Sequence, residues 1–173
     1  MITIKDISVI ITTFKSDDKI YTCLNSLPNN IKVLIIENSN NEKFKTKIEN
    51  QYPNAECILT GSNKGYSVAN NIGLLKVETA YALVLNPDTI VDKNAFDKFL
   101  ISAKNNSDFW LMGPANSQII NRNIKNNSII EVENIKGFAM FFNLIKFRKD
   151  FFDENFFLYF EEIDLCKKVQ LNN

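Results

Sequence analysis

The run ISVIIT at residues 7–12 decides the predicted fold. It is short, β-branched and almost continuously apolar, which is the pattern of a strand buried on both faces of a sheet. A segment with apolar residues at helical spacing follows and stops at Pro28, and a second strand-like run occupies residues 31–36. Strand, helix and strand in this order indicate a parallel sheet.

The same alternation continues to residue 105 and then changes. Further strands are predicted at residues 57–59, 81–85 and 137–142, and helices at residues 42–52, 67–77, 94–103 and 161–169. Residues 116–134 are polar and rich in Asn, so we expect a loop or an irregular hairpin there. A chain of 173 residues has the usual size of one domain, and we predict a single α/β domain over residues 1–173.

Charge and residue usage exclude several classes of protein. The chain has 20 basic and 20 acidic residues and no net charge, so we expect no nucleic-acid partner. Histidine is absent, which excludes Ser-His and Cys-His catalysis and leaves carboxylates as the expected general bases. The three cysteines lack metal-ligand spacing and are odd in number, so we predict that they are reduced core residues.

The sequence contains neither a predicted membrane span nor a secretory signal. Its apolar runs fall short of the roughly 20 residues that cross a bilayer, and its N-terminus lacks a signal-peptide pattern. We therefore expect a cytoplasmic protein. Lys146, Arg148 and Lys149 form a small basic group, which fits either a solvated surface or peripheral contact with phosphate or lipid at the inner face of the membrane.

Polar residues follow four of the predicted strands. They are Thr12 to Phe14, Glu37 to Ser39, Gly61 to Gly65 and Asn86 to Asp88. In open α/β sheets, ligands bind beyond the carboxyl ends of the strands, where loops and helix N-termini converge. The sequence therefore predicts a ligand site at this edge.

Five segments in register carry a resemblance to a known family. They read VIITTF at residues 9–14, IIENS at 35–39, NKGYSVANNIG at 63–73, LVLNPDT at 83–89 and FFLYFEEIDLC at 156–166. Together they resemble glycosyltransferase family two, in particular its rhamnosyltransferase-like bacterial members. The resemblance implies a GT-A type, Rossmann-like mixed sheet with helices on both faces. It also implies sugar transfer with inversion from a nucleotide-sugar donor to a glycan or lipid-linked acceptor, in bacterial surface polysaccharide or glycan synthesis.

The same resemblance assigns the donor side of the site. Glu37 matches the acidic residue that accepts hydrogen bonds from the nucleotide base, although Glu37 taken alone also fits a solvated loop acid. A turn is the simpler interpretation of Asn63, Lys64 and Gly65 taken alone. The predicted nucleotide-sugar-binding residues are Thr13, Phe14, Glu37, Asn63, Lys64, Gly65, Asn70 and Asn86.

Asp88 is the predicted metal ligand, since Mg or Mn prefers carboxylate oxygen and can bridge to the donor diphosphate. The family usually has an Asp-x-Asp triplet at this point. Here Asn86 replaces the first acid, which leaves one carboxylate. A turn-forming Pro-Asp pair is the alternative interpretation of Asp88.

Glu161, Glu162 and Asp164 open the last predicted helix, where the helix dipole also favours carboxylates. By position in the family pattern, Glu162 is the predicted general base and Glu161 the reserve candidate. The family more often has Asp at this position. The aromatic run over residues 151–160 fits core packing, or contact with an acceptor sugar or lipid.

Two other functions stay open at this point. A nucleotidyltransferase also joins a nucleotide-binding α/β sheet to metal-binding acids. A non-catalytic nucleotide-sugar-binding module is the other, because the chain stops at Asn173, where family members usually continue and often supply a metal-ligating His. We therefore expect a catalytic domain that is truncated at its C-terminus.

Overall fold

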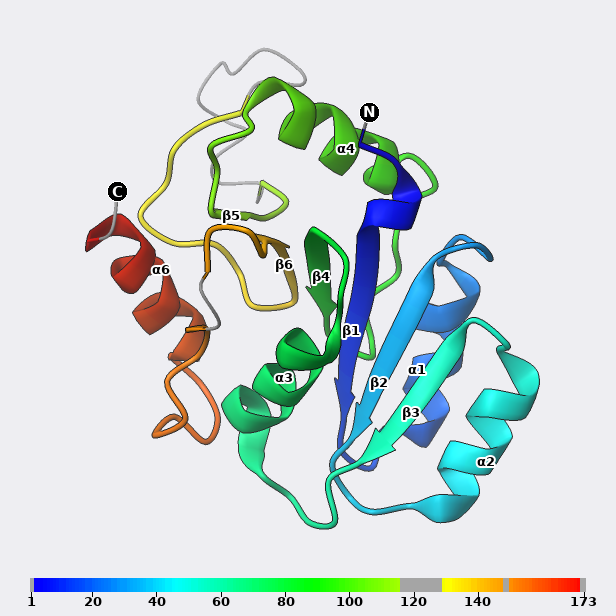
Figure 1. Cartoon of the computed structure of the whole chain (residues 1–173). Helices are drawn as coiled ribbons and strands as arrows, with labels where there is room; N and C mark the ends of the chain where they lie inside the picture. The colour runs from blue at the N-terminus through cyan, green and yellow to red at the C-terminus, as the bar shows by residue number, and fades with distance from the viewer. Residues whose placement is uncertain (1, 116–128, 148–149, 172–173) are drawn as a thin grey trace.

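The buried run at residues 7–12 lies in β1 (Ile7–Thr13), a central strand of a six-stranded sheet (Figure 1). The computed structural model describes residues 2–115, 129–147 and 150–171. The strand order is β3-β2-β1-β4-β6-β5. Three strands run parallel to β1: β2 (Lys32–Glu37), β3 (Ala55–Leu59) and β4 (Tyr81–Leu85). The other two are antiparallel to their neighbours. They are β6 (Ala139–Asn143), which pairs with β4, and β5 (Leu111–Met112), which pairs with β6. The sheet is therefore mixed, as predicted.

Helices cover both faces of this sheet, because alternate residues of β1 enter two separate cores. Val9 and Ile11 pack with the buried residues of α1 (Asp17–Asn25), α2 (Glu42–Gln51) and α4 (Ala95–Asn105). Ile10 packs on the other side with α3 (Gly65–Lys76) and α6 (Glu161–Leu171). A short 3-10 helix, Ile4–Asp6, precedes β1. The alternation expected of a strand buried on both faces is thus confirmed.

Most predicted elements occur within two residues of their expected bounds. The first helix ends at Asn25, short of Pro28, and α3 starts two residues earlier than predicted. Of the predicted irregular loop, residues 116–128 lie outside the described residues, and residues 129–134 belong to neither a helix nor a strand. Arg148 and Lys149 of the basic group also lie outside, while Lys146 pairs with Asp108.

One expectation from composition is met. The cysteines Cys23, Cys57 and Cys166 are free and buried. Within residues 2–115, 129–147 and 150–171, no helix combines the length and the apolar character that crossing a membrane requires.

The parallel strands bring their carboxyl ends to one edge of the sheet. Thr13 at the end of β1 pairs in register with Glu37 at the end of β2, and Ile11 pairs with Leu85 at the end of β4. The polar residues that follow these strands therefore emerge together, as the sequence predicts.

Candidate active site

Glu37 ends β2 and is 1% exposed, so it is not a solvated loop acid. Its Oε1 accepts hydrogen bonds from the main-chain N–H of Ser39 at 3.0 Å and from the Ser39 hydroxyl, and its Oε2 accepts from the Asn41 N–H at 2.6 Å. Glu37 thereby shapes the turn between β2 and α2. Its contact with a nucleotide base stays a prediction.

Asn38 is a residue that the sequence analysis did not single out. It is 2% exposed, and its Nδ2 donates to Asn63 Oδ1 at 2.9 Å and to the Gly65 carbonyl at 3.2 Å. Its Oδ1 accepts from the Thr60 hydroxyl and from the Lys64 N–H, both at 2.9 Å. This one amide holds the loop that presents the exposed Asn63 and Lys64 at the edge of the sheet.

The other predicted donor-side residues differ in their access to solvent. Phe14 is 44% exposed, whereas Thr13 is 2% exposed. Asn70 is 0% exposed: its Oδ1 accepts from the Thr12 hydroxyl at 2.9 Å and its Nδ2 donates to the Tyr66 carbonyl at 3.0 Å. The structure therefore does not bring Asn70 to the open edge, and a ligand contact would require it to leave both partners.

Buried polar atoms without a partner gather at this end of the fold. Among the described residues, three of the four such side-chain atoms are Thr13 Oγ1 at the end of β1, Ser67 Oγ in the first turn of α3 and Glu161 Oε2 at the start of α6. An unpaired buried polar group costs about 1–3 kcal/mol. Such groups call for an explanation, and a ligand site is one.

The segment after β4 carries Asn86 and the exposed Asp88. The Asn86 N–H donates to the Phe138 carbonyl at 3.0 Å, and the Cys23 thiol lies 3.8 Å from the Asn86 carbonyl oxygen. Burial, reinforced by the charge of Asp88, raises the pKa of Cys23 to about 12. The thiol therefore stays protonated beside the segment.

Asp88 supplies one accessible carboxylate for a metal ion. Across the described part of the chain, no group of three or more Cys, Asp or Glu side chains is arranged to hold a metal. Mg²⁺ is commonly held by one or two carboxylates together with substrate phosphates and water. The residues present therefore fit an ion that arrives with a diphosphate, and they do not form an all-protein cage.

The acidic residues of α6 follow a backbone with unusual conformation. Tyr159 and Phe160 have φ values of 72° and 70°, in the left-handed region that residues with a Cβ rarely adopt. Glu161 comes next and is 7% exposed, and its burial, followed by the charge of Glu162, raises the pKa of its carboxyl. Glu162 is half-buried. The two acids thus differ in access, which favours Glu162 over Glu161 for contact with a ligand.

A pair of hydrogen bonds fixes the chain that leads to α6. Asn71 of α3 donates from Nδ2 to the Phe152 carbonyl at 2.9 Å and accepts from the Phe152 N–H at 3.1 Å. The sequence does not predict this pair, because the two residues lie 81 positions apart.

The segments that carry Asp88 and Glu162 meet at Gly137 and Phe138, just before β6. The Phe138 carbonyl accepts from the Asn86 N–H, and a Cβ placed on Gly137 would lie 3.7 Å from the side chain of Glu162. The predicted metal and base segments, 74 positions apart when counted from residue 88 to residue 162, therefore converge on two adjacent residues.

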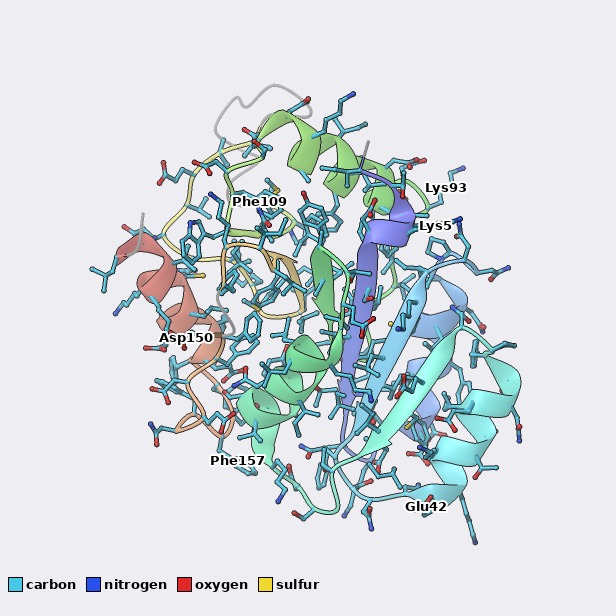
Figure 2. All side chains as sticks on the ribbon, viewed as in Figure 1. Lys5, Glu42, Lys93, Phe109, Asp150 and Phe157 are labelled. Carbon is cyan, nitrogen blue, oxygen red and sulfur yellow. The ribbon has the colours of Figure 1, made fainter. Side chains whose placement is uncertain are left out.

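The aromatic run divides into a buried and an exposed half. Phe151 and Phe152 lie in the core beneath α3 and α6, as core packing predicts. Phe157, Leu158, Tyr159 and Phe160 are 51–69% exposed. Phe157, labelled in Figure 2, lies beside the first turn of α3. An exposed apolar patch therefore borders the predicted base.

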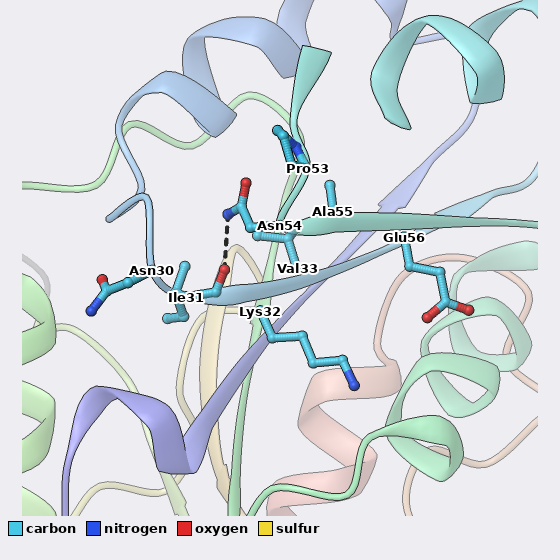
Figure 3. A pocket seen from close by; sticks show the side chains of 8 residues that line it. All are labelled: Asn30, Ile31, Lys32, Val33, Pro53, Asn54, Ala55 and Glu56. Atoms are coloured by element: carbon cyan, nitrogen blue, oxygen red, sulfur yellow. Dashed lines mark hydrogen bonds between the residues drawn. The ribbon is translucent and has the colours of Figure 1, made fainter. Parts of the chain in front are cut away.

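Two cavities lie elsewhere on the molecule. The first, of about 400 Å³, is at the amino ends of β2 and β3, where Asn54 Nδ2 donates to the Ile31 carbonyl at 2.8 Å (Figure 3). The second, of about 470 Å³, is lined by Trp110, Phe147 and residues of α6. Neither of these two cavities is lined by a predicted site residue.

The sequence is similar to known glycosyltransferases. The profile of glycosyl transferase family 2 matches residues 8–166. A low-salt glycan biosynthesis hexosyltransferase of Haloferax volcanii is 22% identical over 198 residues, which cover 97% of this chain and 62% of that protein.

Solved structures share the fold at low sequence identity. S. aureus TarS in complex with UDP has a TM-score of 0.73 and 16% identity, over 96% of this chain and 55% of that chain. The mannosyltransferase PcManGT from Pyrobaculum calidifontis, in complex with GDP-Man and Mn²⁺, has a TM-score of 0.74 and 12% identity, over 95% of this chain and 51% of that chain. The predicted GT-A type fold is thereby confirmed. The chain spans less than two thirds of the length of each of these proteins.

Proposed function

This chain belongs to glycosyl transferase family 2, and we propose that its carboxyl-edge site transfers a sugar from a nucleotide-sugar donor to an acceptor hydroxyl. The observation that carries the proposal is the convergence of the Asp88 and Glu162 segments on Gly137 and Phe138. A transferase of this kind needs a group that supports the departing diphosphate close to a group that takes the acceptor proton.

On the donor side, we propose that the nucleotide lies along the loops after β1, β2 and β3. Asn38 holds Asn63 and Lys64 at this edge, where the exposed lysine offers a positive charge to phosphate. The UDP and GDP-Man bound to the two structural neighbours support a nucleoside diphosphate sugar as the donor class.

For the metal, we propose that Asp88 holds a divalent ion, Mn²⁺ or Mg²⁺, together with the donor diphosphate. The Mn²⁺ in the mannosyltransferase structure supports this assignment, as does the exposure of the carboxylate. When bound, such an ion stabilises negative charge on the leaving diphosphate.

For the chemical step, we propose a single displacement with inversion. The acceptor oxygen forms a bond to the anomeric carbon, and the bond from that carbon to the diphosphate oxygen breaks. The hydroxyl proton passes to the Glu162 carboxylate, and the nucleoside diphosphate leaves with the electron pair. Glu162 is favoured over Glu161 because Glu161 is 7% exposed.

On the acceptor side, we propose that the exposed patch of residues 157–160 contacts a glycan or a lipid-linked glycan. Exposed apolar patches often mark binding surfaces, and this one adjoins the proposed base. The glycan biosynthesis role of the Haloferax relative supports the same class of acceptor. We place the reaction in polysaccharide or glycan synthesis at the inner face of the membrane.

The donor test starts with a thermal-shift screen of nucleoside diphosphates and nucleotide sugars, with and without Mn²⁺. A ligand that binds the folded state raises its apparent stability by mass action. A metal-dependent shift that Asp88→Asn abolishes is the expected result. Pyrophosphate release from a nucleoside triphosphate would instead indicate a nucleotidyltransferase.

The transfer test uses the donor found in that screen and follows acceptor-dependent release of nucleoside diphosphate. Glu162→Gln is expected to lower the rate about 10²-fold or more, which is the usual contribution of a general base. Donor binding should not change. Asp164→Asn, which removes a carboxylate from the same helical turn, is the matched control. Full turnover in Glu162→Gln would remove Glu162 from the mechanism, and binding without any transfer would indicate a non-catalytic module.

A further inference from the structure

Tyr66 contacts three segments that are far apart in the sequence. Its hydroxyl lies 3.0 Å from the Gly137 carbonyl oxygen and 3.3 Å from Asn86 Oδ1. Its main-chain N–H donates to the Phe157 carbonyl at 2.7 Å. The ring packs edge-to-face on Phe152, with centroids 6.1 Å apart. Tyr66 is thus held at both its main chain and its ring.

Each polar partner of Tyr66 adjoins a residue of the proposed chemistry. Asn86 lies two positions before Asp88, and a Cβ placed on Gly137 would lie 3.7 Å from the side chain of Glu162. Phe157 belongs to the exposed patch before α6. The hydroxyl therefore touches both the donor half and the acceptor half of the site.

We propose that Tyr66 is a positioning residue whose hydroxyl ties the metal segment at Asn86 to the Gly137 backbone, and so sets the separation between Asp88 and Glu162. This inference rests on the proposed glycosyl transfer. It assigns Tyr66 no contact with substrate, and the single hydroxyl proton is shared between the two protein acceptors.

The chemistry of the phenol suits this task. Burial, reinforced by the nearby charges of Glu161 and Glu162, raises the pKa of Tyr66 above its ordinary value of 10.0, so the hydroxyl keeps its proton to donate. The Tyr side chain has only two rotatable bonds before its rigid ring, so packing of the ring fixes the position of the hydroxyl. A small misplacement of reacting groups can lower a rate by about 10²-fold.

Tyr66→Phe tests the proposal, because it removes one oxygen and keeps the packed ring. Tyr52→Phe is the matched control: it removes a Tyr hydroxyl that bonds an Asn side chain at 2.9 Å, between α1 and the end of α2. We expect kcat to fall about 10-fold or more in Tyr66→Phe and much less in Tyr52→Phe.

A double-mutant cycle with Asn86→Ala supplies a measurement that general destabilisation does not move. If the hydroxyl acts through Asn86, adding Tyr66→Phe to Asn86→Ala should lower kcat by much less than it does alone. Mn²⁺-dependent binding of the nucleoside diphosphate by calorimetry is the second readout, and it should weaken several-fold in Tyr66→Phe.

The outcomes separate the two proposals. An active wild-type chain in which Tyr66→Phe and Tyr52→Phe behave alike, or in which the cycle is additive, overturns the role of Tyr66. A wild-type chain that binds nucleotide but transfers no sugar overturns the proposed reaction, and an unchanged affinity in Tyr66→Phe then overturns the positioning role as well.

Discussion

Gly65 offers a test of how closely the proposed base segment is built onto α3. It has a φ of +81°, and a Cβ on it would lie 2.5 Å from the Phe157 carbonyl oxygen and 2.8 Å from the Phe157 ring. Gly65→Ala therefore imposes two costs. The left-handed backbone costs a residue with a Cβ about 1–2 kcal/mol. The displaced carbonyl also loses its hydrogen bond from Tyr66, which contributes about 0.5–1.5 kcal/mol.

Gly61 is the matched control, because its φ is +78° and a Cβ there meets nothing within 4 Å. Gly61→Ala should lower the free energy of unfolding by about 1–2 kcal/mol, and Gly65→Ala by about 1.5–3.5 kcal/mol. The entropy that alanine removes from the unfolded chain is common to both and cancels in the comparison.

Urea unfolding of the two variants measures the difference, provided that the slope of free energy against urea is unchanged. Gly65→Ala should also lose more transfer activity than Gly61→Ala, since the displaced segment leads to Glu162. Equal losses of stability in the two variants would refute the close contact between Gly65 and Phe157.

Three further results are expected. Asn38→Ala should lower the free energy of unfolding, measured in urea, by about 2–3 kcal/mol, because it removes the hydrogen bonds of Asn38 to Asn63 and Lys64. It should also weaken nucleotide binding. The pKa of Glu161 is raised in the folded state, so the folded chain keeps a proton that the unfolded chain loses near pH 4.5. The free energy of unfolding should therefore fall as the pH rises from about 4.5 through the raised pKa of the folded state. Glu161→Gln should flatten this dependence in urea titrations over a pH series. Iodoacetamide should leave Cys23, whose pKa is about 12, unlabelled until the chain unfolds, as mass spectrometry would show.

The sheet was predictable because the sequence of each buried strand is itself strongly apolar. β1, β2 and β4 are apolar on both faces, so their burial follows from composition without knowing their partners. The start of α3 was placed two residues late, since Lys64 and Gly65 give no side-chain capping signal in the sequence.

The links within the site were not predictable from the sequence. Asn38, Tyr66 and Asn71 each bond partners 20 or more residues away, and a polar residue inside a motif gives no sign of which distant group it meets. Asn70 shows the limit of a motif match: it belongs to the family pattern, yet the fold buries it against Thr12, which the sequence does not indicate. The 56% exposure of Phe157 also depends on how distant parts of the chain pack around it.

The reciprocal bonds between Asn71 and Phe152 have a consequence for how the molecule assembles. They join positions 81 residues apart, and closing a long loop slows the formation of the contacts at its ends. As a nascent chain leaves the ribosome, strands β1 to β4 are complete before residue 152 is made. We therefore expect pulse-labelled hydrogen exchange to protect the parallel strands first and α6 last, so that the proposed donor side of the site forms before the proposed base is in place.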